Sequence, residues 1–273
     1  MSGVSAMGTM DGKVALVTGA SRGIGNAIAR RFAAAGASVA VTARTVEPGD
    51  SRFEGSISET VEQIIAAGGS AVAVAADLSR QDDRRRLVAE VTRQVGPIDV
   101  LVNNAAVTFF EPVVEFSERH YDLMFEVQVK AAFELAQLTL PGMLARGSGW
   151  ILNISSGAAR HPQGPPYRAG VGRGTVYGMC KAALERFTTG LAGEVSEAGI
   201  VVNVLSPAGI VATPGVVHHR LIAPGAEDLA EPVEVIAEAA HALCAAGPTG
   251  LTGRIAYSAP LLEELGLTPT VLA

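Results

Sequence analysis

Short runs of apolar residues, rich in valine and isoleucine, recur along the chain and restrict its fold more than any other feature. Within each run the apolar residues are continuous rather than alternating, which is typical of strands buried on both faces of a sheet. Six runs begin at Lys13, Ser38, Ala71, Asp99, Trp150 and Ile200, and a last short one lies near GRIAYS at residues 253–258. We therefore predict a sheet that is covered on both sides.

Helical patterns lie between these runs. They span Ile24–Ala35, Ser58–Ala67, Asp82–Val95, Glu118–Leu144, Thr175–Ala198 and Pro232–Ala246. A strand followed by a helix, repeated, gives a parallel sheet with right-handed crossovers. We predict an α/β fold with a doubly wound parallel sheet flanked by helices, in a single domain over residues 11–273. Residues 1–10 are predicted to form a flexible tail.

Composition excludes several classes of partner. The chain has 273 residues, of which 48% are hydrophobic and 18% charged, so it has ample material for a core. A net charge of −6 argues against nucleic-acid or anionic-membrane surfaces. No apolar run reaches the length of a membrane-spanning helix, and the first residues lack the features of a secretory signal. The expected partners are small molecules or further copies of the chain.

The two cysteines, Cys180 and Cys244, have no metal-ligand spacing around them. The neighbouring His218 and His219 invite a metal interpretation, but no third ligand is spaced nearby. We therefore expect no metal site. The lack of a disulfide framework favours a reducing compartment, and we expect a cytoplasmic protein.

Three connections are long and rich in glycine or proline, at residues 44–56, 157–174 and 206–231. Long loops inside a compact domain are usually functional. The second and third each leave the carboxyl end of a predicted strand, where doubly wound sheets bind ligands. We predict that these two form substrate loops, whereas the first has no predicted role beyond proximity to the adenosine end of a cofactor.

The first predicted strand runs directly into TGASRGIG, residues 18–25. Gly19, Gly23 and Gly25 stand where missing β-carbons let backbone N–H groups approach a pyrophosphate, although glycines there can also serve only a tight turn. The strand before and the helix after favour dinucleotide binding. The second strand ends at Arg44 without a carboxylate, and Arg44 and Arg22 suit a 2′-phosphate. We predict NADP(H) rather than NAD(H); two solvated surface arginines are the alternative.

A tyrosine and a lysine stand four positions apart in a predicted helix. Residues i and i+4 share a helix face, so Tyr177 and Lys181 lie side by side. Alone, this spacing also fits two unrelated surface side chains. A positive charge typically lowers the pKa of a phenol, normally near ~10, by ~1–3 units. Such a phenol can act as a general acid or base, which is worth ~10²–10⁴ in rate.

The segments TGASRGIG, NNAA, NISS, YGMCK and VNVLSPAGIVAT, in this order, resemble the short-chain dehydrogenase/reductase family of the classical type. The resemblance covers about residues 12–258. It implies a Rossmann fold, an NAD(P)-dependent oxidoreductase and a homotetramer built in part on the two longest predicted helices.

The resemblance also implies residue roles. Tyr177 becomes the general acid/base, Lys181 bonds the nicotinamide ribose and lowers the pKa of the phenol, and Ser156 bonds the substrate oxygen. A hydrolase role for Ser156 lacks a G-x-S-x-G elbow or a supporting His and Asp pattern. Asp77 flanks the adenine and Thr213 touches the nicotinamide carboxamide. The cofactor-binding residues so predicted are Gly19, Ser21, Arg22, Gly23, Ile24, Gly25, Arg44, Asp77, Leu78, Asn104, Ala105, Tyr177, Lys181, Pro207 and Thr213.

The chain departs from the family pattern at several positions. Gln128 stands where the family has an asparagine thought to hold a water in the proton relay. Glutamine has the same donor and acceptor groups on a longer stem, so we assign Gln128 to the catalytic set, with simple filling of space as the alternative. Ala106 replaces a glycine of the family.

The predicted function is an NADP(H)-dependent oxidoreductase that interconverts a carbonyl compound and an alcohol. A non-catalytic nucleotide-binding sensor or scaffold of the same fold is the alternative, because a fold alone does not fix a function. Dehydratase or epimerase chemistry stays open. The sequence does not identify the substrate; Phe109, Phe110, Val216 and Leu221 only suggest an apolar one.

Overall fold

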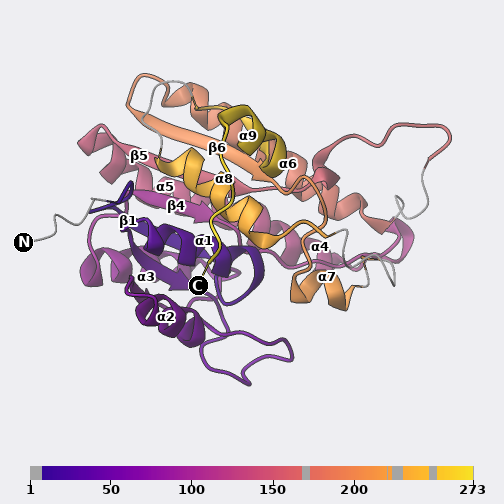
Figure 1. The fold of residues 1–273 in the computed structure, drawn as a ribbon. Helices are drawn as coiled ribbons and strands as arrows, with labels where there is room; N and C mark the ends of the chain where they lie inside the picture. The colour runs from indigo at the N-terminus through magenta and orange to yellow at the C-terminus, as the bar shows by residue number, and fades with distance from the viewer. Residues whose placement is uncertain (1–7, 168–172, 220, 223–229, 246–250, 273) are drawn as a thin grey trace, which may run out of the picture.

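Seven parallel strands form one twisted sheet in the computed structural model of the chain, which describes residues 8–167, 173–219, 221–222, 230–245 and 251–272 (Figure 1). The strand order is β3-β2-β1-β4-β5-β6-β7. The strands are β1 Val14–Thr18, β2 Ser38–Thr42, β3 Ser70–Ala73, β4 Val100–Asn103, β5 Gly149–Ile154, β6 Ile200–Ser206 and β7 Ile255–Tyr257. The predicted doubly wound α/β fold is thus confirmed.

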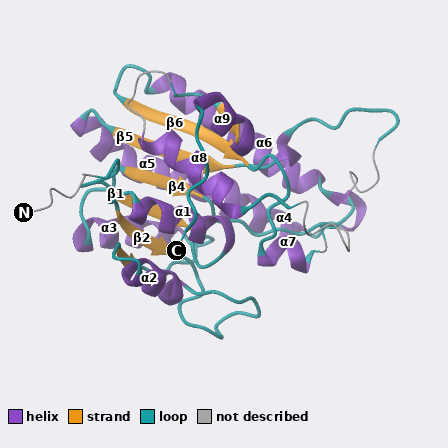
Figure 2. Ribbon diagram, viewed as in Figure 1, coloured by secondary structure: helices purple, strands orange, loops and turns teal. Residues whose placement is uncertain are grey.

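Helices cover both faces of this sheet (Figure 2). They are α1 Gly23–Ala34, α2 Ile57–Ala66, α3 Gln81–Gln94, α4 Glu118–Phe125, α5 Ala131–Arg146, α6 Thr175–Glu194, α7 Pro214–His218, α8 Val233–Ala245 and α9 Ser258–Leu265. Along β1, Ala15 and Val17 face the core under α1 and α8, whereas Val14 and Leu16 face the core under α3 and α5. Burial on both sides explains why the strands read as continuous apolar runs.

One predicted helix is interrupted in the structure. The pattern Glu118–Leu144 forms α4 and α5 with a π-helical segment, Glu126–Lys130, between them. A π turn holds one extra residue, and such turns occur often at functional sites. From α3, the fully buried Arg84 reaches this π segment and α5, with ion pairs of 2.8 Å to Glu126 and 2.6 Å to Glu134.

The predicted flexible tail is too long. Residues 1–7 lie outside the described part of the chain, but Met10 is fully buried in the core and Thr9 Oγ1 lies 2.7 Å from His241 Nε2 of α8. The physical reason is burial of the Met10 side chain, which fixes the adjoining backbone.

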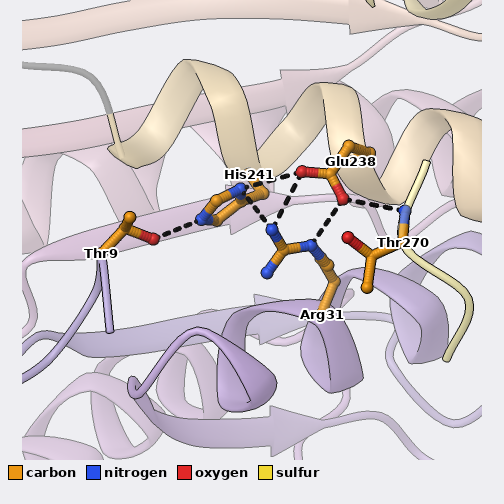
Figure 3. Close-up of polar contacts among 5 residues, drawn as sticks. All are labelled: Thr9, Arg31, Glu238, His241 and Thr270. Carbon is orange, nitrogen blue, oxygen red and sulfur yellow. Dashed lines mark hydrogen bonds and ion pairs between the residues drawn. The ribbon is translucent and has the colours of Figure 1, made fainter. Parts of the chain in front are cut away.

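Thr9 belongs to a polar network that joins both ends of the described chain (Figure 3). Arg31 of α1 donates from Nε and Nη2 to the Glu238 carboxylate of α8, at 2.7 and 2.9 Å. The backbone N–H of Thr270 donates to the same carboxylate at 3.1 Å. Arg31 Nη2 also lies 2.8 Å from His241 Nδ1. The same Nδ1 lies 3.2 Å from Glu238 Oε1, so His241 contacts both members of the Arg31–Glu238 ion pair.

None of the helices within the described residues is both long and apolar enough to cross a membrane.

Candidate active site

A cavity of about 830 Å³ opens across the carboxyl ends of the strands. Every predicted catalytic and cofactor-binding residue lines it except Gly25 and Gln128. The cavity spans the boundary between β1 and β4, where the strand order reverses and doubly wound sheets bind their ligands. Parts of the two predicted substrate loops, residues 168–172, 220 and 223–229, lie outside the described residues.

The glycine loop between β1 and α1 is held from β4. Asn104 Nδ2 donates to the carbonyls of Thr18 and Gly19, at 2.9 and 3.1 Å. Gly19 has a φ of +64°, and a Cβ there would lie 2.7 Å from Ala105 Cα. A Cβ on Gly25 would lie 2.5 Å from Asn104 Nδ2. Gly25 therefore permits the close approach of α1 to β4 rather than lining the cavity.

The start of the loop is also fixed by Thr18. Its hydroxyl donates to the carbonyl of Val102 at 3.1 Å and accepts from the backbone N–H groups of Asn104 and Ala105 at 3.0 and 3.1 Å. Sequence reasoning did not single out Thr18. A polar residue at the end of an apolar strand was the available signal.

Arg22 and Arg44 line the end of the cavity next to β2. Arg22 is half-buried, and its guanidinium donates to the carbonyl of Gly55 at 2.7 Å and to Thr45 Oγ1 at 3.1 Å. Burial lowers its pKa, and the nearby Glu59 acts in the opposite direction. Arg22 therefore holds the connection that follows β2, whereas Arg44 is exposed.

Asp77 follows β3 at the same edge of the sheet. Its carboxylate accepts from the backbone N–H and the hydroxyl of Ser79, at 3.0 and 2.8 Å. Its own N–H donates to Asp83 at 2.8 Å, and that bond contributes most to lowering the pKa of Asp83. Asp77 thus shapes the turn into α3, and Leu78 lines the cavity beside it.

Ser156, Tyr177 and Lys181 come together at the carboxyl end of β5. Ser156 directly follows the strand region, and its hydroxyl forms a hydrogen bond with that of Tyr177. Lys181 Nζ lies 5.6 Å from the centre of the Tyr177 ring. The same ammonium donates to the carbonyl of Ile154 at 2.9 Å. The two side chains of Y-x-x-x-K therefore lie on one side of α6, facing the serine.

With the groups of the protein alone, the pKa of Tyr177 is not lowered as expected. Part of the ring is exposed, but burial of the hydroxyl raises its pKa, and the hydrogen bond with Ser156 offsets this only in part. Burial also lowers the pKa of Lys181 to about 8. Desolvation is the largest cause of both shifts, because both groups leave water on entering the site.

Buried polar bonds hold α6 in register on the sheet. Asn103 Nδ2 donates to Asn153 Oδ1 at 2.9 Å, and Asn153 Nδ2 donates to Thr188 Oγ1 at 2.8 Å. Ser155 Oγ donates to Glu185 at 2.9 Å. These bonds link β4, β5 and α6 and so fix Tyr177 relative to Ser156. Sequence analysis missed them, although amides inside apolar strands were a usable signal.

The sequence profile described as short chain dehydrogenase matches residues 13–220. The chain belongs to this family. A ketoacyl reductase, HetN, of Nostoc sp. is 33% identical over 95% of this chain and 83% of its own length. A short chain dehydrogenase of Pseudocercospora fijiensis is 36% identical over 74% of this chain, and the match spans 61% of that protein. The chain thus covers less than two thirds of the fungal relative.

A solved structure of a metagenomic short-chain oxidoreductase in complex with NADP is also similar. It is 30% identical, covers 96% of this chain and 99% of its own, and superposes with a TM-score of 0.72. In our chain, the same fold brings the glycine loop, Ser156 and the Y-x-x-x-K residues together at the carboxyl ends of the strands.

Gln128, the residue that departs from the family pattern, lies in the π segment and is buried. Its Nε2 donates to the carbonyl of Val107 at 2.8 Å, and its Oε1 is buried and has no hydrogen-bond partner among the described residues. Gln128 lines a small cavity of about 10 Å³ together with Asn103 and Lys181. This volume is close to that needed for one water molecule. Asn103 Oδ1 is a second buried acceptor without a partner.

Helix α7 lines the cavity with Pro214, Gly215, Val216 and His218. Thr213 caps its first turn, accepting from Val216 N–H at 3.3 Å, and a Cβ on Gly23 would lie 2.9 Å from Thr213 Cγ2. Beyond it, the His219 ring packs edge-on against Phe110, with ring centres 5.0 Å apart, and Phe110 packs against Tyr177 at 5.6 Å. Among the residues that the structure describes, no three His, Cys, Asp or Glu side chains gather as a metal site would.

Proposed function

We propose that this short chain dehydrogenase is an NADP(H)-dependent oxidoreductase that interconverts a carbonyl compound and an alcohol, with Tyr177 as the general acid/base. The observation that supports it best is the meeting of the Ser156 and Tyr177 hydroxyls and the Lys181 ammonium in the cavity at the carboxyl end of β5. A purely nucleotide-binding protein has no need of this arrangement.

The residues present fit a dinucleotide. Gly19, Gly23 and Ile24 line the cavity at the start of α1, and the N-cap residue Arg22 makes no side-chain hydrogen bond to the first turn, so backbone N–H groups there are available to a pyrophosphate. Asp77 and Leu78 would line the adenine side, Asn104, Ala105 and Pro207 the middle, and Thr213 the carboxamide end. When bound, the nicotinamide supplies or accepts the hydride.

The chain's own residues would handle the proton. Ser156 and Tyr177 would hold the carbonyl oxygen of the substrate by two hydrogen bonds. Because burial raises the pKa of Tyr177, the phenol is protonated at neutral pH and ready to donate to that oxygen in reduction. In oxidation Tyr177 must first lose its proton, and the resulting phenolate would then take the proton of the alcohol; the positive charges of Lys181 and an oxidised nicotinamide would favour that ionisation.

Gln128 would complete a proton path behind Lys181. The small cavity lies between the Lys181 ammonium and the two unpartnered acceptors, Gln128 Oε1 and Asn103 Oδ1. A water molecule there would accept from Lys181 and donate to these oxygens, which satisfies both buried acceptors. The longer stem of glutamine would then be accommodated by the extra residue of the π turn.

The preference for NADP(H) rests on charge at the β2 end of the cavity. No carboxylate stands at the end of β2, while Arg22 and Arg44 line that end. The similar metagenomic oxidoreductase was solved in complex with NADP. Tighter binding of NADH than of NADPH in a titration would contradict this part of the proposal.

The substrate is proposed to be a carbonyl compound with an apolar body. Phe109, Phe110, Val216 and Leu221 line the cavity beyond Tyr177. His219, whose pKa burial lowers, would be neutral there and lies 3.1 Å from Thr108 Oγ1. Ketone reduction also fits the name of the Nostoc relative, a ketoacyl reductase.

We further propose that the enzyme is a single-domain cytoplasmic homotetramer. On α5 and α6, Phe133 and Met179 are 49% and 44% exposed, and Phe133 packs on Phe187. Such apolar side chains suit a contact between copies. Light scattering of the purified chain tests this, since a monomeric mass would contradict it.

Turnover of carbonyl compounds with NADPH tests the central proposal. Tyr177→Phe should lower kcat by ~10²–10⁴ while leaving NADPH affinity nearly unchanged. Tyr121→Phe, an exposed tyrosine of α4, is the matched control and should keep wild-type turnover. Cofactor binding without turnover of any compound in a broad panel would favour a sensor or scaffold instead.

A further inference from the structure

The long connection after β2 is built onto the glycine loop. Its described path runs from Thr45 to Gly55, and Arg22 fastens both ends by donating to Thr45 Oγ1 and to the Gly55 carbonyl. The Arg22 guanidinium also lies 3.4 Å from Ser51 Oγ. These bonds use both terminal nitrogens of Arg22. Most of the hydrogen-bonding capacity of its guanidinium therefore goes to holding the connection in place.

Phe53, two residues before the end of this connection, is surrounded by cationic and aromatic groups. The guanidinium carbons of Arg22 and Arg52 lie 5.6 and 4.9 Å from the centre of its ring. The His218 ring of α7 packs edge-on against Phe53, with centres 5.2 Å apart. Arg52 Nη2 in turn lies 3.2 Å from His218 Nε2. The Phe53 ring therefore packs against the Arg52 guanidinium and helps to fix its position.

Three guanidiniums line this end of the cavity, those of Arg22, Arg44 and Arg52. Within the described residues, none of the three forms an ion pair with a carboxylate. Of the three acidic residues of the connection, Glu54 is exposed and forms no ion pair with these arginines within the described residues, and the other two are engaged elsewhere. Asp50 accepts from the N–H groups of Val46 and Glu47, and Glu47 accepts from Ser58. Uncompensated positive charge converging on one cavity wall favours a multiply charged anion.

We infer that Arg52, carried by the connection between β2 and α2, is a specificity-determining residue that binds the 2′-phosphate of the cofactor together with Arg44. Arg22 acts there mainly as a positioning residue for the connection. Guanidinium groups suit this task because their planar fork donates two parallel hydrogen bonds to phosphate. The inference rests on the proposed use of NADP(H) and assigns the cofactor choice to a segment outside the glycine loop and the end of β2.

The contact with His218 connects Arg52 to the substrate end of the cavity. Helix α7 carries His218, and the adjacent His219 packs on Phe110, which packs on Tyr177. Arg52 is thus held by Phe53 and by α7, and it lines the cavity. These contacts give an exposed loop arginine a defined position.

Binding of NADPH and NADH to the purified full chain tests the inference by fluorescence titration. Arg52→Met keeps the length of the side chain and removes the charge, and it should weaken NADPH binding about ten-fold while changing NADH binding less than about two-fold. Arg93→Met, on the exposed side of α3, is the matched control and should change neither. Arg52→Lys should recover part of the loss.

A second probe separates the phosphate from the rest of the cofactor. Displacement by adenosine 2′-monophosphate should weaken in Arg52→Met, whereas displacement by adenosine 5′-monophosphate should not. Equal losses for NADPH and NADH, or no loss for either, would overturn the role of Arg52. Tighter NADH than NADPH binding by the wild type would instead refute the proposed cofactor preference itself, so the two failures are distinguishable.

Discussion

Two demands meet at Lys181. Its ammonium is almost fully buried, which lowers its pKa to about 8, yet the proposed chemistry needs its positive charge. At neutral pH most molecules still carry that charge. The hydrogen bond to the Ile154 carbonyl supplies one partner, and the small cavity beside Gln128 offers space for a second.

This burial predicts a pH-dependent stability. Below about pH 8 both folded and unfolded chains carry the Lys181 charge, and folding bears the full cost of burying it. Between about 8 and its ordinary value of 10.5, the folded chain loses the proton first, so the contribution of Lys181 to stability rises with pH. Urea unfolding should therefore show wild type gaining about 2 kcal/mol relative to Lys181→Met from pH 7 to pH 10. Parallel stability curves for the two proteins would contradict this.

Gln128 gives a second prediction at this scale. Gln128→Asn keeps an amide in the relay position and should retain turnover to within about three-fold, whereas Gln128→Ala should lower kcat about ten-fold. NADPH affinity, measured alongside, should stay unchanged in both variants. If Gln128→Ala turned over as fast as wild type, the residue would merely fill space.

Among elements, the π segment depends on a contact from α3. Arg84 is fully buried and pairs with Glu126 of the segment and Glu134 of α5, and it also donates to the Leu78 carbonyl. The arginine therefore ties the helix that carries Gln128 to the turn that lines the adenine side of the cavity.

Arg84→Met should lower the free energy of unfolding by about 3–5 kcal/mol, because it leaves two partly buried carboxylates without their cation. Arg86→Met on the same helix is the control. Its pairs with Asp83 and Glu90 are exposed, so its loss should cost less than about 1 kcal/mol. Chemical denaturation measures both, and equal effects would show that the buried pairs contribute little.

For the whole molecule, the network around Glu238 joins α1, α8 and both ends of the described chain (Figure 3). Burial alone would raise the pKa of Glu238, but the bonds from Arg31 and Thr270 outweigh it and lower the pKa to about 2. Burial and Arg31 lower the pKa of His241, which keeps that ring neutral.

Both shifts predict loss of stability in acid. The unfolded chain protonates His241 more readily below its ordinary pKa of 6.5, and the Glu238 contribution is lost as the pH falls from 4.5 toward 2. Glu238→Gln should cost about 2 kcal/mol at pH 7 and progressively less at lower pH. Glu264→Gln is the comparison: the exposed pair with Arg254 also lowers the pKa of Glu264, but solvent screens it, so the pH dependence should be clearly smaller than for Glu238→Gln. Thermal melts across pH 3–7 would reveal a constant deficit if the assignment is wrong.

Predictability from the sequence follows the range of the interactions. Most helices were predicted, and so were the strands, because a strand that is buried on both faces has a continuous apolar run in the sequence. The pairing of Tyr177 with Lys181 follows from the helical repeat alone. The π segment was not predicted, since one extra residue in a turn leaves the apolar pattern almost unchanged. Helix α7 was also missed, although Thr213 followed by Pro214 is a usual helix start.

The alternation of strands and helices, the glycine turn and the Y-x-x-x-K face could be predicted from the chain, because each depends on residues close together in it. The contacts of Arg22 with the connection after β2, the position of Arg52 beside His218 and the burial of Met10 became visible only in the folded protein. Desolvation decided the direction of the Tyr177 pKa. Such outcomes depend on groups far apart in sequence, whose contacts and loss of water exist only once the chain has folded.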